Sequence, residues 1–278
     1  MTANNDNSIY SRISDLMGEE QAPGRPAPPA KIVVDNFSVL FGRSESLRRI
    51  SMDIFPRERL AIIGPAGSGK TTFLRSLNRL NDLEEGFGHT GRILLDGQDI
   101  FDPDTDVPSL RRRLGMVYAV PTPFPWSIRE NITFGPRMSG MTHGGRLEEL
   151  VESSLRSAFL WDEVKDRLDL DATKLSGGQQ QRMCLARVLA LEPEVLLLDE
   201  PCSGLDPIST ARIEEALAQL KQRYSIVLVT NNTKQAARAS DRTAFLLMGE
   251  LVEIGPTRQL FTSPVHGRTN DYITGHFG

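Results

Sequence analysis

A short glycine-rich segment limits what this chain can fold into more than any other part of the sequence. Residues 64–72 read GPAGSGKTT and fit the pattern G-x-x-x-x-G-K-[ST]. An apolar run, RLAIIG, leads into the segment, and a helical pattern follows it. In such a strand–loop–helix unit the glycines let successive backbone N–H groups turn towards phosphate oxygens, and the helix N-terminus adds partial positive charge. The segment therefore predicts a binding site for the phosphates of ATP or GTP.

Two side chains of this segment have specific predicted roles. We expect Lys70 to reach the β- and γ-phosphates and the Thr71 hydroxyl to hold Mg²⁺. The predicted phosphate-binding set is Gly64, Pro65, Ala66, Gly67, Ser68, Gly69, Lys70, Thr71 and Thr72.

A second carboxylate-bearing segment, EVLLLDE, reads as a strand buried on both faces. Asp199 follows its apolar core, where the side chain can meet Mg²⁺ through water. Glu200 comes next and is the candidate general base that polarises the attacking water. Taken alone, the pair is equally typical of a strand that ends in a turn before Pro201. The glycine-rich segment favours the metal-site interpretation.

The chain divides into a tail and a globular part. Residues 1–30 end in QAPGRPAPPA, which is rich in proline, so we expect a disordered tail. Residues 31–278 begin with β-rich runs and continue with strands that alternate with helices. Within them, residues of about 121–175 predict a helical insertion, whose first helix starts at the capping-box pair Ser127 and Glu130. One face of a following helix collects Leu147, Leu150, Val151, Leu155, Ala158 and Phe159. Near the C-terminus a hairpin is expected to turn at residues 248–250.

Charge and hydropathy exclude several classes of protein. The formal net charge of −4 gives no basic field, so we expect no nucleic-acid partner. Apolar stretches fall short of the roughly 18 residues needed to cross a bilayer. The polar N-terminus lacks the apolar segment of a secretory signal, so a soluble, cytoplasmic chain is expected. Neither the two cysteines nor the four histidines have metal-ligand spacing.

Two further segments carry a family resemblance. LSGGQQQR at residues 175–182 resembles the signature of ABC ATPases, and SGLDP follows at 203–207, so the chain is identified as a member of that superfamily. The resemblance implies an α/β fold with a P-loop NTPase (RecA-like) core, an antiparallel β subdomain and an inserted α-helical subdomain. It also implies a dimer in which the signature of one subunit contacts the ATP on the other subunit's glycine-rich loop. The residues implied to make this contact are Ser176, Gly177, Gly178 and Gln179. Asp206 is implied to help the two ATP sites of the dimer communicate across the interface.

A narrower resemblance concerns the ATPase subunit of the phosphate-specific importer. Four segments are similar to it: residues 77–83, 96–117, 121–137 and 240–257. The resemblance implies phosphate as cargo and integral membrane permease subunits as partners. It also implies an indirect partnership with a substrate-binding protein and a peripheral position on the cytoplasmic face of the membrane. Phe41 falls where the family places an aromatic that stacks on adenine, although a core aromatic of an early strand is an equally good interpretation.

Two positions depart from the family pattern. Ala119 stands where the family has a glutamine, and Asn231 stands where it has a histidine that contacts the γ-phosphate. Alanine has no hydrogen-bonding group, and asparagine cannot become a charged imidazolium. We therefore expect near-normal MgATP affinity with slow turnover, either in a homodimer or in a heterodimer with another ABC ATPase.

Two other classes of function fit parts of the sequence. The first is an ATP-dependent dimerising regulator that powers no transport, which the departures at Ala119 and Asn231 favour. The second is an unrelated P-loop kinase or GTPase that uses Lys70 to transfer phosphate, which the LSGGQQQR segment disfavours.

Overall fold

A six-stranded sheet forms the centre of the molecule and runs in the order β10-β9-β3-β8-β7-β6. β3, β6, β7, β8 and β9 are parallel to their neighbours, and β10 closes one edge antiparallel to β9. The strands are β3 (Arg59–Ile63), β6 (Leu114–Val117), β7 (Val195–Asp199), β8 (Ser225–Val229), β9 (Arg242–Leu247) and β10 (Glu250–Pro256). Because the strands are parallel, the loops that follow β3, β7 and β8 meet at the same edge of the sheet.

The two central strands, β7 and β8, correspond to continuous apolar runs in the sequence because both of their faces are buried. Every residue of β7 and β8 is buried. Leu196 and Leu198 join the core cluster on one face, whereas Val195 and Leu197 join the cluster on the other face. Side chains alternate across a strand, so burial of both faces requires apolar residues at successive positions. The strand predicted from EVLLLDE is confirmed.

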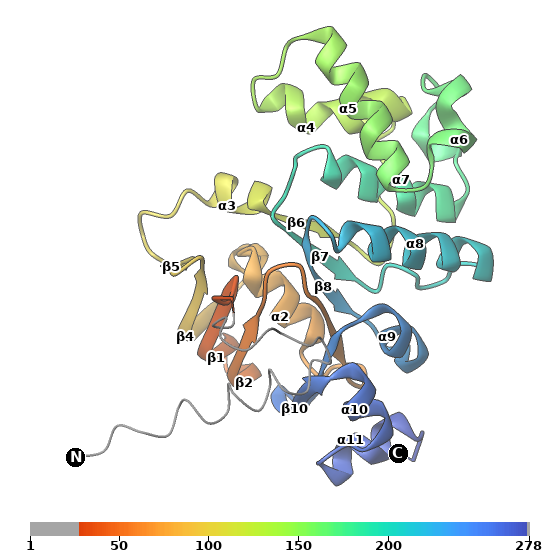
Figure 1. Cartoon of the computed structure of the whole chain (residues 1–278). Coiled ribbons are helices and arrows are strands. Elements are labelled where there is room, and N and C mark those ends of the chain that lie inside the picture. Colours follow the sequence, from red (N-terminus) through yellow and green to blue (C-terminus); the bar gives the residue numbers. More distant parts are fainter. Residues whose placement is uncertain (1–27, 277–278) are drawn as a thin grey trace.

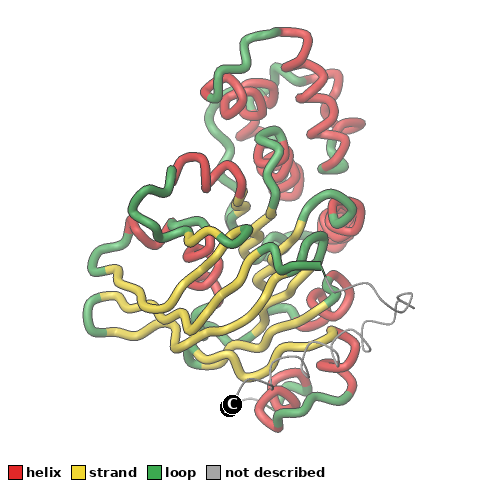
Figure 2. Tube along the Cα trace, turned by 60° about the vertical axis from the view of Figure 1, so that its left-hand side comes forward, coloured by secondary structure: helices red, strands yellow, loops and turns green. Residues whose placement is uncertain are grey.

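A second, antiparallel sheet lies beside the central one and has the order β2-β1-β4-β5 (Figure 2). Its strands are β1 (Ile32–Phe41), β2 (Ser44–Ile54), β4 (Phe87–Leu95) and β5 (Gln98–Asp99). The inward side chains of β1, β2 and β4 share one apolar cluster with residues of β3 and β8, so the two sheets are packed together. The predicted fold class, an α/β P-loop core with an antiparallel β subdomain, is confirmed.

Helices cover the central sheet, and a group of them rises above it in Figure 1. The α-helices are α2 (Lys70–Leu77), α3 (Val107–Arg113), α4 (Ile128–Met138), α5 (Gly144–Ser157), α6 (Trp161–Val164), α7 (Gly177–Leu189), α8 (Pro207–Leu220), α9 (Thr233–Ala239), α10 (Thr257–Thr262) and α11 (Gly267–Ile273). Short 3-10 turns are η1 (Leu80–Leu83), η2 (Lys165–Arg167) and η3 (Ala172–Lys174).

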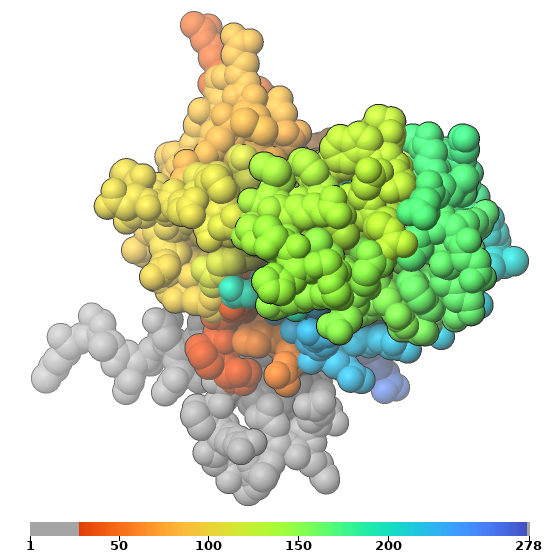
Figure 3. All heavy atoms as spheres, turned by 90° about the horizontal axis from the view of Figure 1, so that it is seen from above, coloured from red at the N-terminus to blue at the C-terminus, as the bar shows by residue number. Residues whose placement is uncertain are grey.

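The predicted helical insertion falls on α4, α5 and α6, between β6 and β7. Seen from above, these helices form a broad surface over the molecule (Figure 3). The capping box that starts α4 is confirmed, because Ser127 accepts from Glu130 N and the Glu130 carboxylate accepts from Ser127 N. The predicted apolar face of α5 is turned inward. The boundaries of the insertion at about 121 and 175 stay a prediction.

The computed structural model describes residues 28–276 of the chain. The predicted tail therefore lies, apart from its last three residues, outside the described part. The predicted hairpin is β9–β10, which turns with φ of 50° at Met248 and 81° at Gly249. Between residues 28 and 276, no helix has both the length and the apolar character to span a bilayer.

Four charged side chains connect the two sheets. Lys31 precedes β1 and Asp96 follows β4 of the antiparallel sheet, whereas Arg113 ends α3 and Glu194 precedes β7. Lys31 Nζ lies 2.8 Å from Asp96 Oδ2 and 2.5 Å from Glu194 Oε2. Arg113 pairs with both carboxylates. Its hydrogen bond to Glu194, together with that of Lys31, lowers the pKa of Glu194 to about 2.

Glu194→Gln tests this four-charge group. A carboxyl whose pKa falls on folding stabilises the folded state above its unfolded pKa of 4.5, and this contribution is lost as pH falls towards 2. Because the side chain is 38% exposed, solvent screening limits the effect, and we expect Glu194→Gln to lower the free energy of unfolding by about 1 kcal/mol at pH 7. Urea denaturation at pH 7 and pH 3 measures it, and the difference from wild type should shrink at pH 3.

The control is Asp35→Asn, which removes an exposed pair with Arg92. It should change the free energy of unfolding by less than about 0.5 kcal/mol. A larger loss in Asp35→Asn than in Glu194→Gln would contradict the role given to the four-charge group.

Candidate functional site

The glycine-rich loop joins the end of β3 to the start of α2 and turns through two positions that only glycine fits. Gly64 has φ of 153°, and a Cβ atom there would lie 2.1 Å from the carbonyl oxygen of Leu246. Gly69 has φ of 95°, and its Cβ would lie 2.9 Å from the carbonyl oxygen of Ser46. Both contacts are with rigid backbone, so any side chain would displace the loop. The loop is therefore fixed between β2 and β9.

Lys70 folds back over this loop. Its Nζ atom donates to the carbonyl oxygens of Gly64, at 2.8 Å, and Pro65, at 2.9 Å. Burial lowers the pKa of Lys70, and the nearby carboxylates of Glu200 and Asp199 partly counter this effect. The ammonium thus lies at the centre of the loop, where phosphate oxygens can replace the two carbonyls as its partners.

Two oxygen ligands of the predicted metal site lie together. Thr71 Oγ1 donates to Asp199 Oδ1 at 3.1 Å, although the two residues come from different strand–helix units. Burial raises the pKa of Asp199, and the Thr71 hydrogen bond opposes the rise. A hydroxyl and a carboxylate fit Mg²⁺, which takes oxygen ligands and keeps several waters and substrate phosphates. Among residues 28–276, no three His, Cys, Asp or Glu side chains gather into a metal cage.

Glu200 faces the same loop in an unusual backbone conformation. Its φ is 47°, in the left-handed region that non-glycine residues seldom occupy. Burial raises the pKa of the Glu200 carboxyl, and a hydrogen bond with the backbone of Asn231 opposes the rise. A carboxylate held in this way is suited to accept a proton from a water molecule.

One pocket is lined by residues from four parts of the chain. Its lining consists of Ser46, Ala66, Gly67, Ser68, Gly69, Lys70, Thr71, Thr72, Glu200 and Asn231. Sequence reasoning missed Ser46, on β2, whose hydroxyl donates to Thr72 Oγ1 at 3.0 Å. No motif contains Ser46, so only the fold reveals it. The arrangement can bind a polyphosphate and activate water beside it.

The LSGGQ segment forms the N-terminus of α7 and lies outside this pocket. Ser176 caps the helix: its Oγ accepts from Gln179 N at 3.4 Å, and Gln179 Oε1 accepts from Ser176 N at 3.1 Å. Ser176 and Gly177 are exposed. Gly178 is buried because Ser209 of α8 occupies the space that its Cβ would need, 2.1 Å from Ser209 Oγ. The segment thus presents a capped helix N-terminus to the surface.

Glu163 on α6 holds this helix N-terminus in place and was not predicted from the sequence. Its carboxylate accepts from Gln179 Nε2 at 2.9 Å and from two nitrogens of Arg182 at 2.7 and 3.1 Å. The Arg182 side chain is buried. Because Gln179 donates its amide to Glu163, its carbonyl oxygen is left to accept from Ser176. Glu163 therefore orients the glutamine that completes the cap.

Three further residues singled out in the sequence are absent from the pocket lining. Asp206 is exposed and caps α8, accepting from Ile208 N and Ser209 N at 2.9 Å. Phe41 is half-buried at the end of β1, 6.1 Å from the ring of Phe87, so the structure leaves both of its interpretations open. Ala119 follows β6 and is not part of the pocket lining described above.

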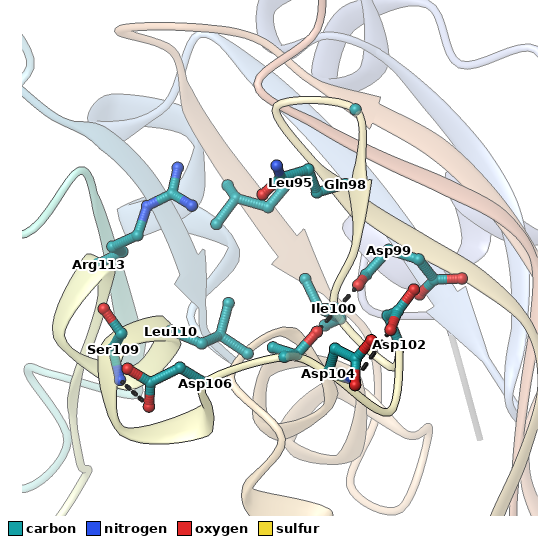
Figure 4. A pocket seen from close by; sticks show the side chains of 12 residues that line it. Leu95, Gln98, Asp99, Ile100, Asp102, Asp104, Asp106, Ser109, Leu110 and Arg113 are labelled. Carbon is teal, nitrogen blue, oxygen red and sulfur yellow. Dashed lines mark hydrogen bonds between the residues drawn. The ribbon is translucent and has the colours of Figure 1, made fainter.

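A wider hollow lies elsewhere, between β5 and α3 (Figure 4). Four aspartates line it, yet three of them serve local structure. Asp99 and Asp102 accept backbone N–H groups within their own loop, and Asp106 caps α3. None of the predicted site residues lines this hollow.

Comparison with known proteins identifies the family and supports the fold. The family model described as ABC transporter matches residues 47–203, more than half of the chain. The structure is similar to a bacterial Atm1-family ABC exporter with ATP bound, with a TM-score of 0.75 and 28% identity over 92% of this chain. It is also similar to cbiO1 from Clostridium perfringens, part of the ABC transporter complex cbiONQ, with a TM-score of 0.73 and 25% identity. This chain covers 44% of the exporter chain, and the cbiO1 match covers 89% of this chain and 96% of that chain.

Glu163→Gln tests the support of the α7 N-terminus. The buried Arg182 would lose its carboxylate partner, and because Glu163 itself is partly exposed we expect a loss of about 1–2 kcal/mol in the free energy of unfolding. Hydrogen–deuterium exchange of the backbone amides of residues 176–182 should also become faster. The matched control is Asp162→Asn, whose side chain is 83% exposed and should change neither quantity appreciably. Unaltered exchange in Glu163→Gln would refute the role given to Glu163.

Proposed function

The chain belongs to the ABC transporter family as an ATP-binding domain, and from this premise we propose that it hydrolyses ATP to energise an importer through partner membrane subunits. The observation that carries the proposal is one pocket. In it, Lys70 and Thr71 of the glycine-rich segment meet Glu200 and Asn231, which follow two other strands of the sheet. The narrower proposal, that the cargo is inorganic phosphate, is supported by the likeness of residues 77–83, 96–117, 121–137 and 240–257 to the phosphate importer's subunit.

In the proposed mechanism, the role of each polar side chain of the site follows from its position. Lys70 exchanges the carbonyl oxygens of Gly64 and Pro65 for the β- and γ-phosphate oxygens of ATP. Thr71 and, through water, Asp199 would hold Mg²⁺, and the ion would neutralise charge on the phosphates. Glu200, with its raised pKa, accepts a proton from the attacking water.

A second subunit completes the site in this proposal. Ser176, Gly177 and Gly178 lie outside the chain's own pocket, on an exposed helix N-terminus that suits an anion. A face-to-face dimer would bring this segment against the γ-phosphate held by the other subunit. The second subunit is another copy of this chain or a different ABC ATPase.

An apolar surface on the helical insertion supports contact with membrane subunits. Trp126 and Phe134 are 40% and 41% exposed, and their rings lie 5.3 Å apart. Exposed aromatic side chains that lie together are typical of a protein interface. The proposed location is therefore the cytoplasmic face of the membrane, as a peripheral subunit.

A second candidate function is an ATP-dependent dimerising regulator that powers no transport. Ala119 and Asn231 favour it, because they lack groups that help the bound state react. Purification from native membranes discriminates between the two. A polytopic membrane protein that remains bound supports the transporter, and its consistent absence supports the regulator.

The double change Ala119→Gln and Asn231→His tests the slow turnover. Loss of one transition-state contact lowers the rate a hundredfold or more in related enzymes. We therefore expect the rate of ATP hydrolysis to rise at least about tenfold in the double variant. The Kd for MgATP should stay within about twofold, because the binding loop is unchanged. Steady-state release of phosphate measures the rate.

The control for this test is Leu83→Gln, at an exposed position on η1 away from the pocket lining. It should leave the rate as it is in the wild type. An unchanged rate in the double variant, with normal MgATP affinity, would show that these two positions do not limit turnover.

A further inference from the structure

A closed ring of hydrogen bonds holds the turn that carries Asn231. The turn joins the end of β8 to α9, which lies beside the central sheet in Figure 1. Thr230 Oγ1 donates to Gln235 Oε1 at 2.8 Å and accepts from Asn232 N at 3.1 Å. Asn232 Oδ1 accepts from Gln235 N at 3.0 Å and closes the ring. The ring therefore fixes the chain on both sides of Asn231.

The side chains that link the two ends of this turn are buried. Thr230 and Gln235 are 1% and 2% exposed. A buried amide or hydroxyl costs free energy unless it is hydrogen-bonded, and an apolar side chain of the same size would fill the space without that cost. The benefit of a threonine and a glutamine here therefore lies in the hydrogen bond between them.

The end of β8 is also connected to both other parts of the pocket. Thr230 N donates to the carbonyl oxygen of Ile62 at 3.1 Å, on the strand that leads into the glycine-rich loop. Glu200 N donates to the carbonyl oxygen of Val229 at 2.8 Å. The strand end is thus bonded to β3 and to the candidate base, and the ring sets the direction in which the chain leaves it.

Asn231 depends on this support because nothing encloses its side chain. It is exposed and lines the pocket together with Lys70 and Glu200. The side chain of asparagine is also shorter than that of histidine, so its amide reaches a phosphate only if the backbone lies in the right place. A misplacement of about 1 Å in a reacting group or its support can cost a hundredfold in rate.

We propose that Thr230 and Gln235 are positioning residues that hold Asn231 where its amide donates to the terminal phosphate of bound ATP. The inference rests on the proposed function of the pocket as a site of ATP hydrolysis. It gives a role to two buried polar residues that none of the nucleotide-binding segments described above contains.

Thr230→Val tests the ring, because it replaces the hydroxyl with a methyl group of similar size. We expect kcat for ATP hydrolysis to fall about three- to tenfold, the scale of one lost hydrogen bond. KM and the Kd for MgATP should stay within about twofold, since the glycine-rich loop is unchanged. Thr230→Ser keeps the hydroxyl and should retain kcat within about twofold of the wild-type value.

Gln235→Met removes the acceptor of the ring and keeps the volume of the side chain. It should lower kcat in the same way, and it decides the matter if Thr230→Val does not fold. Asn231→Ala should lower kcat in the wild type but by less than about twofold in Gln235→Met, because the asparagine is already misplaced there. Such non-additivity is expected of residues that act through one another and not of independent sites.

The matched control is Thr243→Val on β9. Thr243 is also a buried threonine, and its hydroxyl lies 3.2 Å from the hydroxyl of Ser240 and 2.9 Å from that of Thr257. These three residues are absent from the pocket lining. Thr243→Val should leave kcat within about twofold of the wild-type value, and urea denaturation shows whether it is as destabilised as Thr230→Val.

The wild type is measured first, for MgATP binding and for hydrolysis. If it hydrolyses ATP and both ring variants keep its kcat, or if Thr243→Val lowers kcat as much as they do, the positioning role is overturned and the proposed function is untouched. The same holds if Asn231→Ala has an equal effect with and without Gln235. If the wild type binds MgATP but hydrolyses none, the proposed function fails, and the role of the ring fails with it.

Discussion

Parallel pairing of β7, β8 and β3 is the constraint on which the candidate site depends. It aligns the carboxyl ends of three strands, so that the glycine-rich loop, the Asp199–Glu200 pair and Asn231 meet at one edge although they are far apart in the chain. The pairing is possible because every residue of the two central strands is buried and their apolar residues alternate between two apolar clusters. A polar residue in place of one of these apolar residues would weaken the core and displace the site residues together.

The electrostatics of the pocket follow from partial burial. Burial lowers the pKa of Lys70 and raises the pKa values of Asp199 and Glu200, and the opposite charges of these groups limit each shift. The tasks proposed for the two carboxylates differ because their surroundings differ. Asp199 accepts from the Thr71 hydroxyl, whereas the backbone of Asn231 opposes the rise in the pKa of Glu200. In the proposed function one fold thus provides a phosphate ligand, a metal ligand and a base.

The sequence was sufficient for the features that depend on local patterns. Glycine spacing, strand hydropathy and capping pairs predicted the α/β fold and the start of α4. Contacts between distant segments carry no local pattern and could not be predicted. Glu163, for example, supports the α7 N-terminus from another helix. Ser46 joins the pocket only because β2 packs against the loop.

The most direct test of this account is titration of the purified chain with MgATP, beside Lys70→Ala and the control Lys165→Ala. The account predicts saturable binding by the wild type, because backbone amides and Lys70 converge on the phosphates. It predicts at least about tenfold weaker binding by Lys70→Ala, the scale of one lost charge-assisted contact, and wild-type binding by Lys165→Ala. Absence of saturable binding by the wild type, or equal binding by Lys70→Ala, would contradict the central claim.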